Sequence, residues 1–122
     1  MSDPVQQQID AYNNQDLDGF VAAYSEDVVL EDGEGNAMAQ GHDGIRELYA
    51  ELFDRSPQLH GEVLNRISVG QYVIDEERVT GINMEGYPSE MHAAVILQTG
   101  RGQDRPRAAT ELGAVALKNM RS

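Results

Sequence analysis

The sequence predicts an α+β fold in which helices come first and cover one face of a curved, mainly antiparallel sheet. Three observations support this prediction. Segments with helical apolar spacing precede Pro57, the alternation typical of strands follows it, and short turns separate the later segments. Strands that follow helices and are joined by hairpin-length turns favour an antiparallel sheet. With 122 residues, the chain is expected to form a single domain over residues 1–122.

Three helices are predicted in the first half of the chain, each with a polar start or stop and an apolar stripe. Asp3 and Asp16 fit the N-caps of the first two helices, and Ser56 followed by Pro57 fits the end of the third. The stripes consist of Val5, Ile9 and Tyr12; Leu17, Phe20, Val21 and Tyr24; and Ile45, Leu48, Tyr49, Leu52 and Phe53. Because each stripe lies on one side of its helix, we expect the three stripes to share a core.

Extended segments are predicted in most of the remaining sequence. They cover residues 28–31, 37–40, 62–69, 72–75, 78–82 and 91–98. The acidic run Asp75–Glu77 is expected to interrupt or bulge the segment that contains it. In the last part of the sequence, Ala108, Leu112, Val115 and Ala116 fit a helical face, whereas residues 112–117 fit a closing strand, so both alternatives stay open.

The charge balance excludes several classes of partner. Nine basic and 21 acidic residues give a net charge of −12, which is unfavourable for binding nucleic acid or an anionic membrane. No apolar run approaches the ~18 residues that span a bilayer, and the first ten residues lack the pattern of a signal peptide. We therefore expect no nucleic-acid or membrane partner, and the expected location is the cytoplasm.

The sequence gives little support for a metal or cofactor site. It contains no cysteine, which excludes disulfides and thiolate ligands. The acidic residues between Glu26 and Glu34 lack the spacing of a calcium loop, and His42, His60 and His92 form no HxH or HxxxH pair. No phosphate loop or GxSxG nucleophile motif is present. We expect neither a metal nor a cofactor.

Asp32 is the first candidate for acid/base chemistry, because it follows a strand and is expected at the mouth of a cavity lined by the apolar stripe of the second helix. A carboxylate that is partly removed from water has a raised pKa and can act as a base. The alternative is a turn former, since an acid followed by a glycine, here Gly33, often caps local amides.

His92 is the second candidate, and its direction is open at this stage. It shares a strand face with Ala94 and Ile96, and this face can point into the cavity or outward. If the face is inward, His92 lies across the cavity from Asp32 and can act as an acid, a base or a hydrogen-bond donor. Arg66 has the same ambiguity, and its usual fate is an exposed salt bridge.

Four segments together resemble a known group of proteins. They are AYNNQDLDGFVAAYSED, VVLED, GHDGIRELYAELF and YVIDEERVTG, and their order and spacing are similar to those of the nuclear transport factor 2-like (NTF2-like) superfamily, in its SnoaL-like branch with ketosteroid isomerases and polyketide cyclases. The resemblance is strongest over residues 5–98, whereas residues 99–122 diverge. It implies a cone-shaped α+β fold that is open at one end, and commonly a homodimer packed through the outer face of the sheet.

The resemblance reproduces only part of the isomerase site. Asp32 falls at the position of the proton-shuttling aspartate of ketosteroid isomerases. Gln8 stands at the position of their oxyanion-hole tyrosine, and Val95 lies near the position of their protonated acid, so the oxyanion hole is missing. This argues against efficient steroid isomerisation. Tyr24 and Tyr49 match positions where relatives place pocket aromatics.

Two classes of function follow from these observations. The first is a cofactor-independent acid/base enzyme of isomerase, cyclase or hydrolase type, with Asp32 and His92 as catalytic residues acting on an apolar, ring-bearing small molecule. The expected substrate-binding residues are Gln8, Tyr12, Phe20, Tyr24, Tyr49 and Phe53. The second class is a non-catalytic module that uses the same cone to bind a ligand or to dimerise. The fold by itself does not choose between them.

Overall fold

The computed structural model describes residues 3–32, 34–98 and 112–119. These residues form helices α1 (Pro4–Asn13), α2 (Leu17–Ala22) and α3 (Gly41–Arg55), and strands β1 (Tyr24–Glu31), β2 (Ala37–Gln40), β3 (His60–Val69), β4 (Tyr72–Thr80), β5 (Met91–Gln98) and β6 (Leu112–Asn119). The strands make one sheet in the order β2-β1-β6-β5-β4-β3. The β1–β6 pair is parallel and the other neighbours are antiparallel. The predicted fold class, with helices first and a mainly antiparallel sheet, is confirmed.

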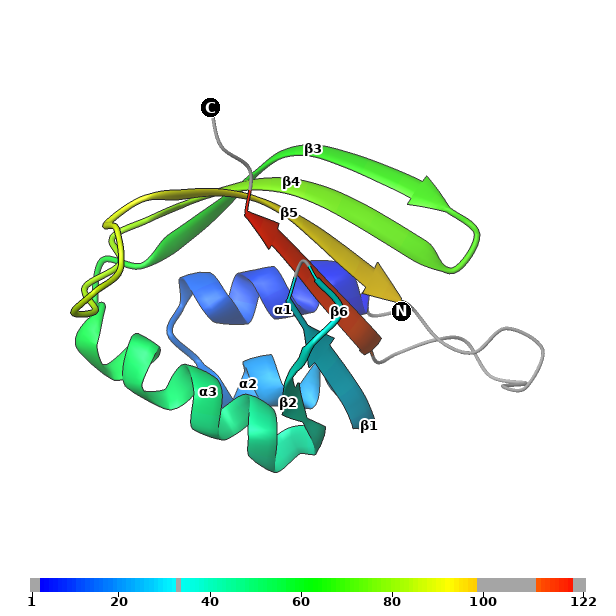
Figure 1. Ribbon diagram of the computed structural model, residues 1–122, viewed down its shortest axis with the longest axis horizontal. Helices are drawn as coiled ribbons and strands as arrows, with labels where there is room; N and C mark the ends of the chain where they lie inside the picture. The colour runs from blue at the N-terminus through cyan, green and yellow to red at the C-terminus, as the bar shows by residue number, and fades with distance from the viewer. Residues whose placement is uncertain (1–2, 33, 99–111, 120–122) are drawn as a thin grey trace.

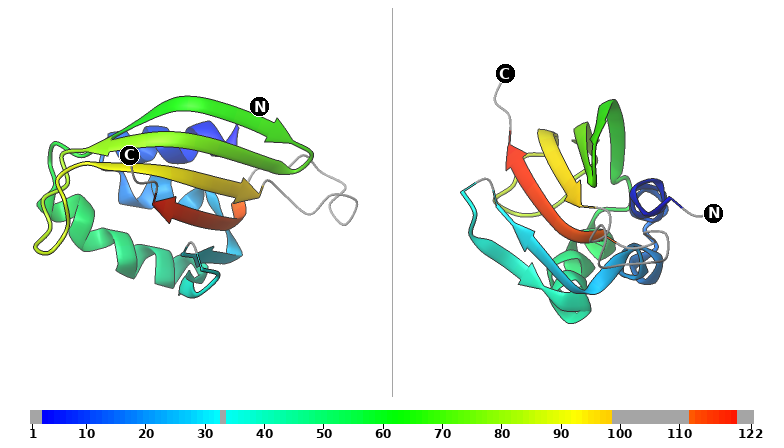
Figure 2. Two further views of the ribbon diagram at one scale, coloured as in Figure 1. Left: turned by 45° about the horizontal axis from the view of Figure 1, so that its top comes forward. Right: turned by 90° about the vertical axis from the view of Figure 1, so that its right-hand side faces the viewer.

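The sheet curves around the helices (Figures 1 and 2). Strands β3, β4 and β5 arch over α1 and α2, while α3 packs beside β1 and β2. The predicted apolar stripes meet in the enclosed space, where Val5, Phe20, Ile45 and Phe53 are buried. Leu48 of the third stripe is the exception, because its side chain is exposed. The concave face of the sheet therefore closes over a core that is supplied mainly by the helices.

The N-caps are as predicted. The Asp3 carboxylate accepts a hydrogen bond from the backbone N–H of Val5 at 3.0 Å, and the Asp16 carboxylate accepts one from Gly19 at 3.0 Å. Helix α2 is shorter than predicted, however, and Tyr24 is the first residue of β1 instead of the end of a helical stripe. Pairing of Tyr24 with Leu112 of β6 draws this residue into the sheet, and its side chain is still buried.

The predicted interruption at the acidic run is wrong. Strand β4 continues through Asp75, Glu76 and Glu77, and its burial alternates, so that Asp75 and Glu77 face inward. The irregularity lies instead in β3, where the register shifts between Val63 and Asn65. At the chain end, β6 pairs with both β1 and β5, so the closing-strand alternative is the correct one.

The β3 bulge decides where Arg66 points. Without it, Val63 and Arg66 would lie on opposite faces, because strand side chains alternate. With the register shift, Val63 pairs with Glu77 and Arg66 pairs with Asp75, so all four residues share the inner face. Arg66 is therefore an inward residue, and the exposed salt bridge expected for it is not what the structure contains.

Asn13 fastens the end of α1 to the free edge of β3. Its side-chain amide donates to the Gly61 carbonyl at 3.1 Å, and its side-chain oxygen accepts from the Gly61 backbone N–H at 2.7 Å. This pair imitates the hydrogen bonds of a neighbouring strand at an edge that otherwise has no strand partner. In addition, Gln15 donates to the Leu59 carbonyl at 3.0 Å.

In the part of the chain that the structure describes, no helix is both long and apolar enough to cross a membrane.

Replacing Asn13 with alanine is expected to lower the free energy of unfolding by about 1–3 kcal/mol, because both Gly61 backbone groups lose their partner. Urea denaturation measures this change. The matched control is Asn14→Ala, since Asn14 is exposed and its side chain makes no hydrogen bond with a described residue. Equal losses in the two variants would contradict the assignment of Asn13 as the fastening residue.

Candidate functional site

Asp32 caps the loop that follows β1. One carboxylate oxygen accepts hydrogen bonds from the backbone N–H groups of Asn36 and Glu34, both at 2.9 Å, and the other accepts from the Asn36 side-chain amide at 3.3 Å. These bonds, that from the Asn36 backbone first, lower the pKa of Asp32. A base needs the opposite environment, so the prediction of a desolvated Asp32 is wrong, and its turn-forming alternative describes the residue.

His92 lies on the outer face of the sheet. Its strand neighbours Ala93 and Val95 are buried toward the core, which places His92 on the opposite side. There its ring Nε2 lies 2.7 Å from a carboxylate oxygen of Glu76. Because Glu76 also lies on this face, the inward alternative for His92 is wrong, and His92 cannot act across an inner cavity.

The residues predicted to bind substrate do come together in the interior. They are Gln8 and Tyr12 from α1, Phe20 from α2, Tyr24 from β1, and Tyr49 and Phe53 from α3. The closest rings are those of Phe20 and Tyr49, with centroids 4.7 Å apart, and the Tyr24 hydroxyl donates to the Gln8 side-chain oxygen at 3.3 Å. We call the five aromatic residues among them the aromatic cluster, which Gln8 borders. Their role toward a ligand stays a prediction.

Glu77 is the residue that sequence reasoning missed. It extends from β4 toward the core and is only 6% exposed. Burial, together with the negative charge of Asp75, raises the pKa of Glu77 to about 7, while the positive charge of Arg66 opposes the rise. A carboxyl with this pKa exchanges a proton near neutral pH, which is the property that was sought in Asp32.

The Glu77 carboxylate faces the tyrosines of the aromatic cluster. Burial raises the pKa of Tyr12, Tyr24 and Tyr49, and the negative charge of Glu77 adds to the rise in each of them. Three phenols from three different elements therefore lie close enough to Glu77 for its charge to raise their pKa values. Their raised pKa values keep the hydroxyls protonated, so each remains a hydrogen-bond donor at neutral pH.

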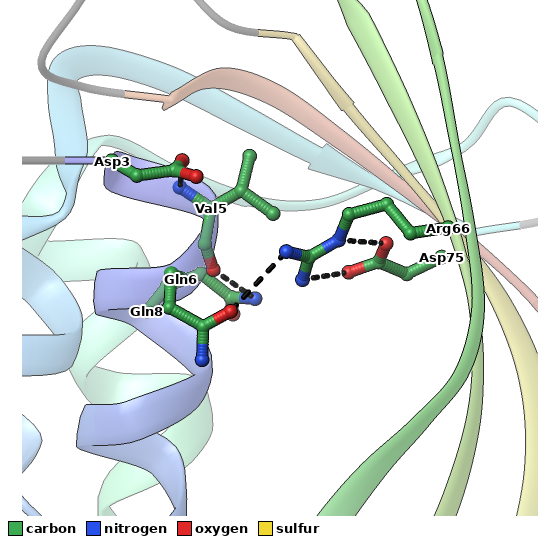
Figure 3. Close-up of polar contacts among 6 residues, drawn as sticks. All are labelled: Asp3, Val5, Gln6, Gln8, Arg66 and Asp75. Carbon is green, nitrogen blue, oxygen red and sulfur yellow. Dashed lines mark hydrogen bonds and ion pairs between the residues drawn. The ribbon is translucent and has the colours of Figure 1, made fainter.

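Arg66 and Asp75 form a bidentate ion pair (Figure 3), and Asp75 lies two residues before Glu77 on β4. The Arg66 Nε and Nη2 atoms donate to the two Asp75 carboxylate oxygens at 2.7 and 2.9 Å, and Asp75 is fully buried. The Arg66 Nη1 atom donates to the side-chain oxygen of Gln6 in α1 at 3.2 Å. The hydrogen bond to Asp75 raises the pKa of Arg66, so the arginine stays charged. Fork-to-fork pairs of this kind are strong and geometrically specific.

An open groove of about 440 Å³ lies between α1 and β3. It is lined by Gln6, Ile9, Asn13, His60, Gly61, Glu62, Val63 and Arg66. Arg66 connects this groove to the inward-facing carboxyl groups of β4. Its guanidinium contacts Gln6 on the groove side and Asp75 on the inner side. The inner carboxylates therefore lie behind a residue that a molecule in the groove can reach.

A signal for Glu77 was present in the sequence. In the segment VIDEERV, Val73, Asp75, Glu77 and Val79 are spaced by two residues, so they occupy the inward phase of a continuous strand. An acid at an apolar phase is costly unless it is paired, and it therefore marks a site. An interruption at the three consecutive acids would break this two-residue spacing, so the prediction of an interruption left no inward position for Glu77.

Comparison with known proteins identifies the family. The family model described as "SnoaL-like domain" matches residues 5–108, so the chain belongs to this family, as the resemblance of its sequence predicted. No curated protein matches the chain. Among the described residues, no group of three or more His, Asp or Glu side chains is placed to hold a metal ion.

Three solved structures show how widely the fold recurs. An uncharacterised cystatin-fold protein from Novosphingobium aromaticivorans is 27% identical, with a TM-score of 0.78 and coverage of 97% of this chain and 95% of that one. An LEH-like epoxide hydrolase from M. tuberculosis is 14% identical, with a TM-score of 0.73 and coverage of 96% and 80%. A ketosteroid isomerase-like protein from Erwinia carotovora atroseptica is 15% identical, with a TM-score of 0.64 and coverage of 98% and 92%. The last two similarities show the fold alone.

The raised pKa of Glu77 predicts a pH-dependent stability. Between 4.5, the ordinary carboxyl value, and about 7, Glu77 binds a proton in the folded state but not in the unfolded one, so stability falls as pH rises through this window. Glu77→Gln removes this dependence. The variant is expected to match wild type near about pH 4 and to exceed it by roughly 3 kcal/mol at about pH 8.

Denaturant unfolding at a series of pH values measures the difference. Glu62→Gln is the matched control, because it makes the same chemical change at an exposed position of the neighbouring strand and should leave the pH profile unchanged. A Glu77→Gln profile parallel to that of wild type would contradict the raised pKa.

Proposed function

We propose that this protein is a cofactor-independent acid/base enzyme acting on a small, ring-bearing, mostly apolar molecule, and that Glu77 is its base. The observation that supports this most directly is the position of Glu77, a buried carboxyl whose pKa is raised to about 7 and which faces three phenols. The proposed catalytic residue thus moves from Asp32 to Glu77. The likeness to an epoxide hydrolase and to a ketosteroid isomerase-like protein is consistent with such chemistry, but at these identities it supports only the fold.

The proposed reaction is a proton transfer. The ionised Glu77 takes a proton from a substrate C–H next to a carbonyl, or from a water that attacks the substrate, and later returns it to the product. The Tyr12 and Tyr49 hydroxyls make no hydrogen bond with a described residue, so they are available to donate to the oxygen on which negative charge develops. Preorganised donors of this kind stabilise the transition state more than the ground state.

The remaining side chains have positioning roles in this proposal. The rings of Phe20 and Phe53 pack against each other with centroids 5.5 Å apart and would present one apolar side to the substrate skeleton. The Arg66–Asp75 pair is a positioning pair, because it fixes two opposite charges that both influence the pKa of Glu77 and holds Asp75 fully buried. The Tyr24 hydroxyl is already engaged with Gln8 and serves to orient that amide.

Glu77→Gln is expected to reduce turnover by about 10²- to 10⁴-fold, because glutamine cannot accept the proton. The assay is a screen of ring-bearing ketones, esters and epoxides, followed by kinetics on any substrate that is turned over. Asp32→Asn and Glu76→Gln are the controls, since one lies in a surface turn and the other on the outer face, and both should leave turnover near the wild-type level. Activity in wild type that survives Glu77→Gln would overturn Glu77 as the base. Wild-type protein that turns over none of these substrates would overturn the enzyme proposal and leave a binding module.

We also propose that two copies of the chain pack through the outer face of the sheet, as the family resemblance implies. Ile67, Ile74 and Ile96 stand in register across β3, β4 and β5, and Ile67 is 53% exposed. On the same face, Glu76 pairs with His92, and Arg78 pairs with Glu90. In a chain of net charge −12, this apolar face with paired charges is suited to contact a second, equally acidic copy.

The double substitution Ile67→Glu and Ile96→Glu is expected to convert a dimer of twice 13.4 kDa into a monomer, because four buried carboxylates would face each other at the interface. Sedimentation velocity measures the mass. Met38→Glu is the control, as Met38 is exposed on β2, away from this row. A wild-type protein that is monomeric at micromolar concentration would refute the proposed packing.

A further inference from the structure

We propose that the cluster around Glu77 binds a protonated amine attached to an apolar ring skeleton. This inference goes beyond acid/base catalysis, because it assigns the charge of the ligand and does not require turnover. The ligand's ring would contact the aromatic cluster, and its ammonium group would donate hydrogen bonds to the Glu77 carboxylate.

The first support comes from the way in which the buried charges are paired. Arg66 directs two N–H donors at Asp75 and a third at Gln6, and none of these hydrogen bonds goes to Glu77. Glu77 is more than nine-tenths buried and accepts no hydrogen bond from any residue in the described ranges. With both acids ionised, the three side chains carry a net charge of −1. No described side-chain oxygen or nitrogen is both fully buried and without a partner, so the Glu77 carboxylate keeps access to space that a ligand can reach. An ammonium ligand there would supply the opposite charge and the hydrogen bonds that this largely desolvated anion lacks.

The second support is the kind of group that faces Glu77 from each neighbouring element. The titratable side chains are Tyr12 from α1, Tyr24 from β1, Tyr49 from α3, Arg66 from β3 and Asp75 from β4. Strand β5 places Ala93 opposite Glu77. Apart from Arg66, no described residue in this set brings a positive charge. Aromatic rings beside a carboxylate are the combination that recognises alkylammonium groups.

The third support concerns ligands of the opposite charge. The arginines of the described segments are all committed to carboxylates, in the pairs Arg46–Asp18, Arg55–Glu51, Arg66–Asp75 and Arg78–Glu90. The charge of each of these arginines is thus already balanced by a carboxylate, which weakens its attraction for an anionic ligand. A carboxylate ligand would also place a third negative charge beside Asp75 and Glu77. The net charge of −12 attracts cations toward the protein, and the unpaired negative charge of the site favours their binding over that of anions.

Three probes of nearly equal shape and different charge test the inference: naphthylmethylamine, naphthylmethanol and naphthoate. Isothermal titration calorimetry at about pH 8 is expected to show the amine binding about tenfold or more tightly than the alcohol, and no binding of the acid. In Glu77→Gln the advantage of the amine should disappear while the alcohol still binds. Glu76→Gln, with the same change on the outer face, should preserve the wild-type order.

A second measurement needs no substitution. When wild-type protein is titrated at about pH 5.5, Glu77 is protonated, so the amine should lose most of its advantage over the alcohol although it remains charged itself. The inference is overturned if the alcohol binds as tightly as the amine at about pH 8, if none of the probes binds, or if the preference survives either Glu77→Gln or acidification. Failure of the catalytic proposal is a separate outcome, since it is read from turnover of neutral substrates.

Discussion

The bidentate pair between Arg66 and Asp75 is the interaction on which the interior of this protein depends. It allows a carboxylate to be fully buried in the concave face of the sheet, because the guanidinium supplies both charge and two hydrogen bonds. The same guanidinium reaches Gln6, so the pair also connects β3 and β4 to α1. Glu77 lies two residues further along β4 and is buried in the same interior, but it accepts none of the Arg66 hydrogen bonds. Burial without these hydrogen bonds explains why the pKa of Glu77 is raised.

Backbone features that look minor place this pair. The β3 bulge turns Arg66 inward, and the absence of a side chain at Gly61 lets α1 approach the sheet closely. A Cβ atom at Gly61 would lie 2.9 Å from Ile9 Cδ1 and 3.5 Å from the Tyr12 ring, so a larger residue there would push the helix and its tyrosine away from the sheet. The Asn13 hydrogen bonds fix the same junction from the strand edge. The β3 bulge, the close approach of α1 at Gly61 and the Asn13 hydrogen bonds thus all help to set the distance between Tyr12 and Glu77.

Much of this arrangement could be predicted from the sequence, because helical stripes and strand alternation report directly on which side chains face a core. The five rings of the aromatic cluster follow from those stripes and come together in the interior, and Gln8, which only the family resemblance indicated, joins them. The acid/base residue could not be predicted in the same way. Asp32 and Glu77 are both acids in extended segments, and only the tertiary fold shows that one meets free amides in a turn and the other meets phenols in the interior.

For a related reason, the sequence could not show whether the side chains of His92 and Arg66 point inward or outward. A strand pattern fixes which residues share a face, but the choice of the inward face depends on the neighbouring strands and on any bulge. For His92 the phase is set by the buried Ala93 and Val95. For Arg66 the phase is reset by one extra residue in β3, and nothing in the local sequence marks that position.

The burial of Glu77 is best understood as a cost that the fold bears for its ligand site. An isosteric apolar or amide residue at this position would favour the folded state at neutral pH, since it would not resist ionisation. The surrounding contacts do not need the carboxylate either, because Arg66 and Asp75 satisfy each other and the aromatic rings pack together. A group that destabilises its own fold, lies among protonated phenols and stands next to a fixed ion pair has the properties of a residue retained for what it binds or for the proton it exchanges.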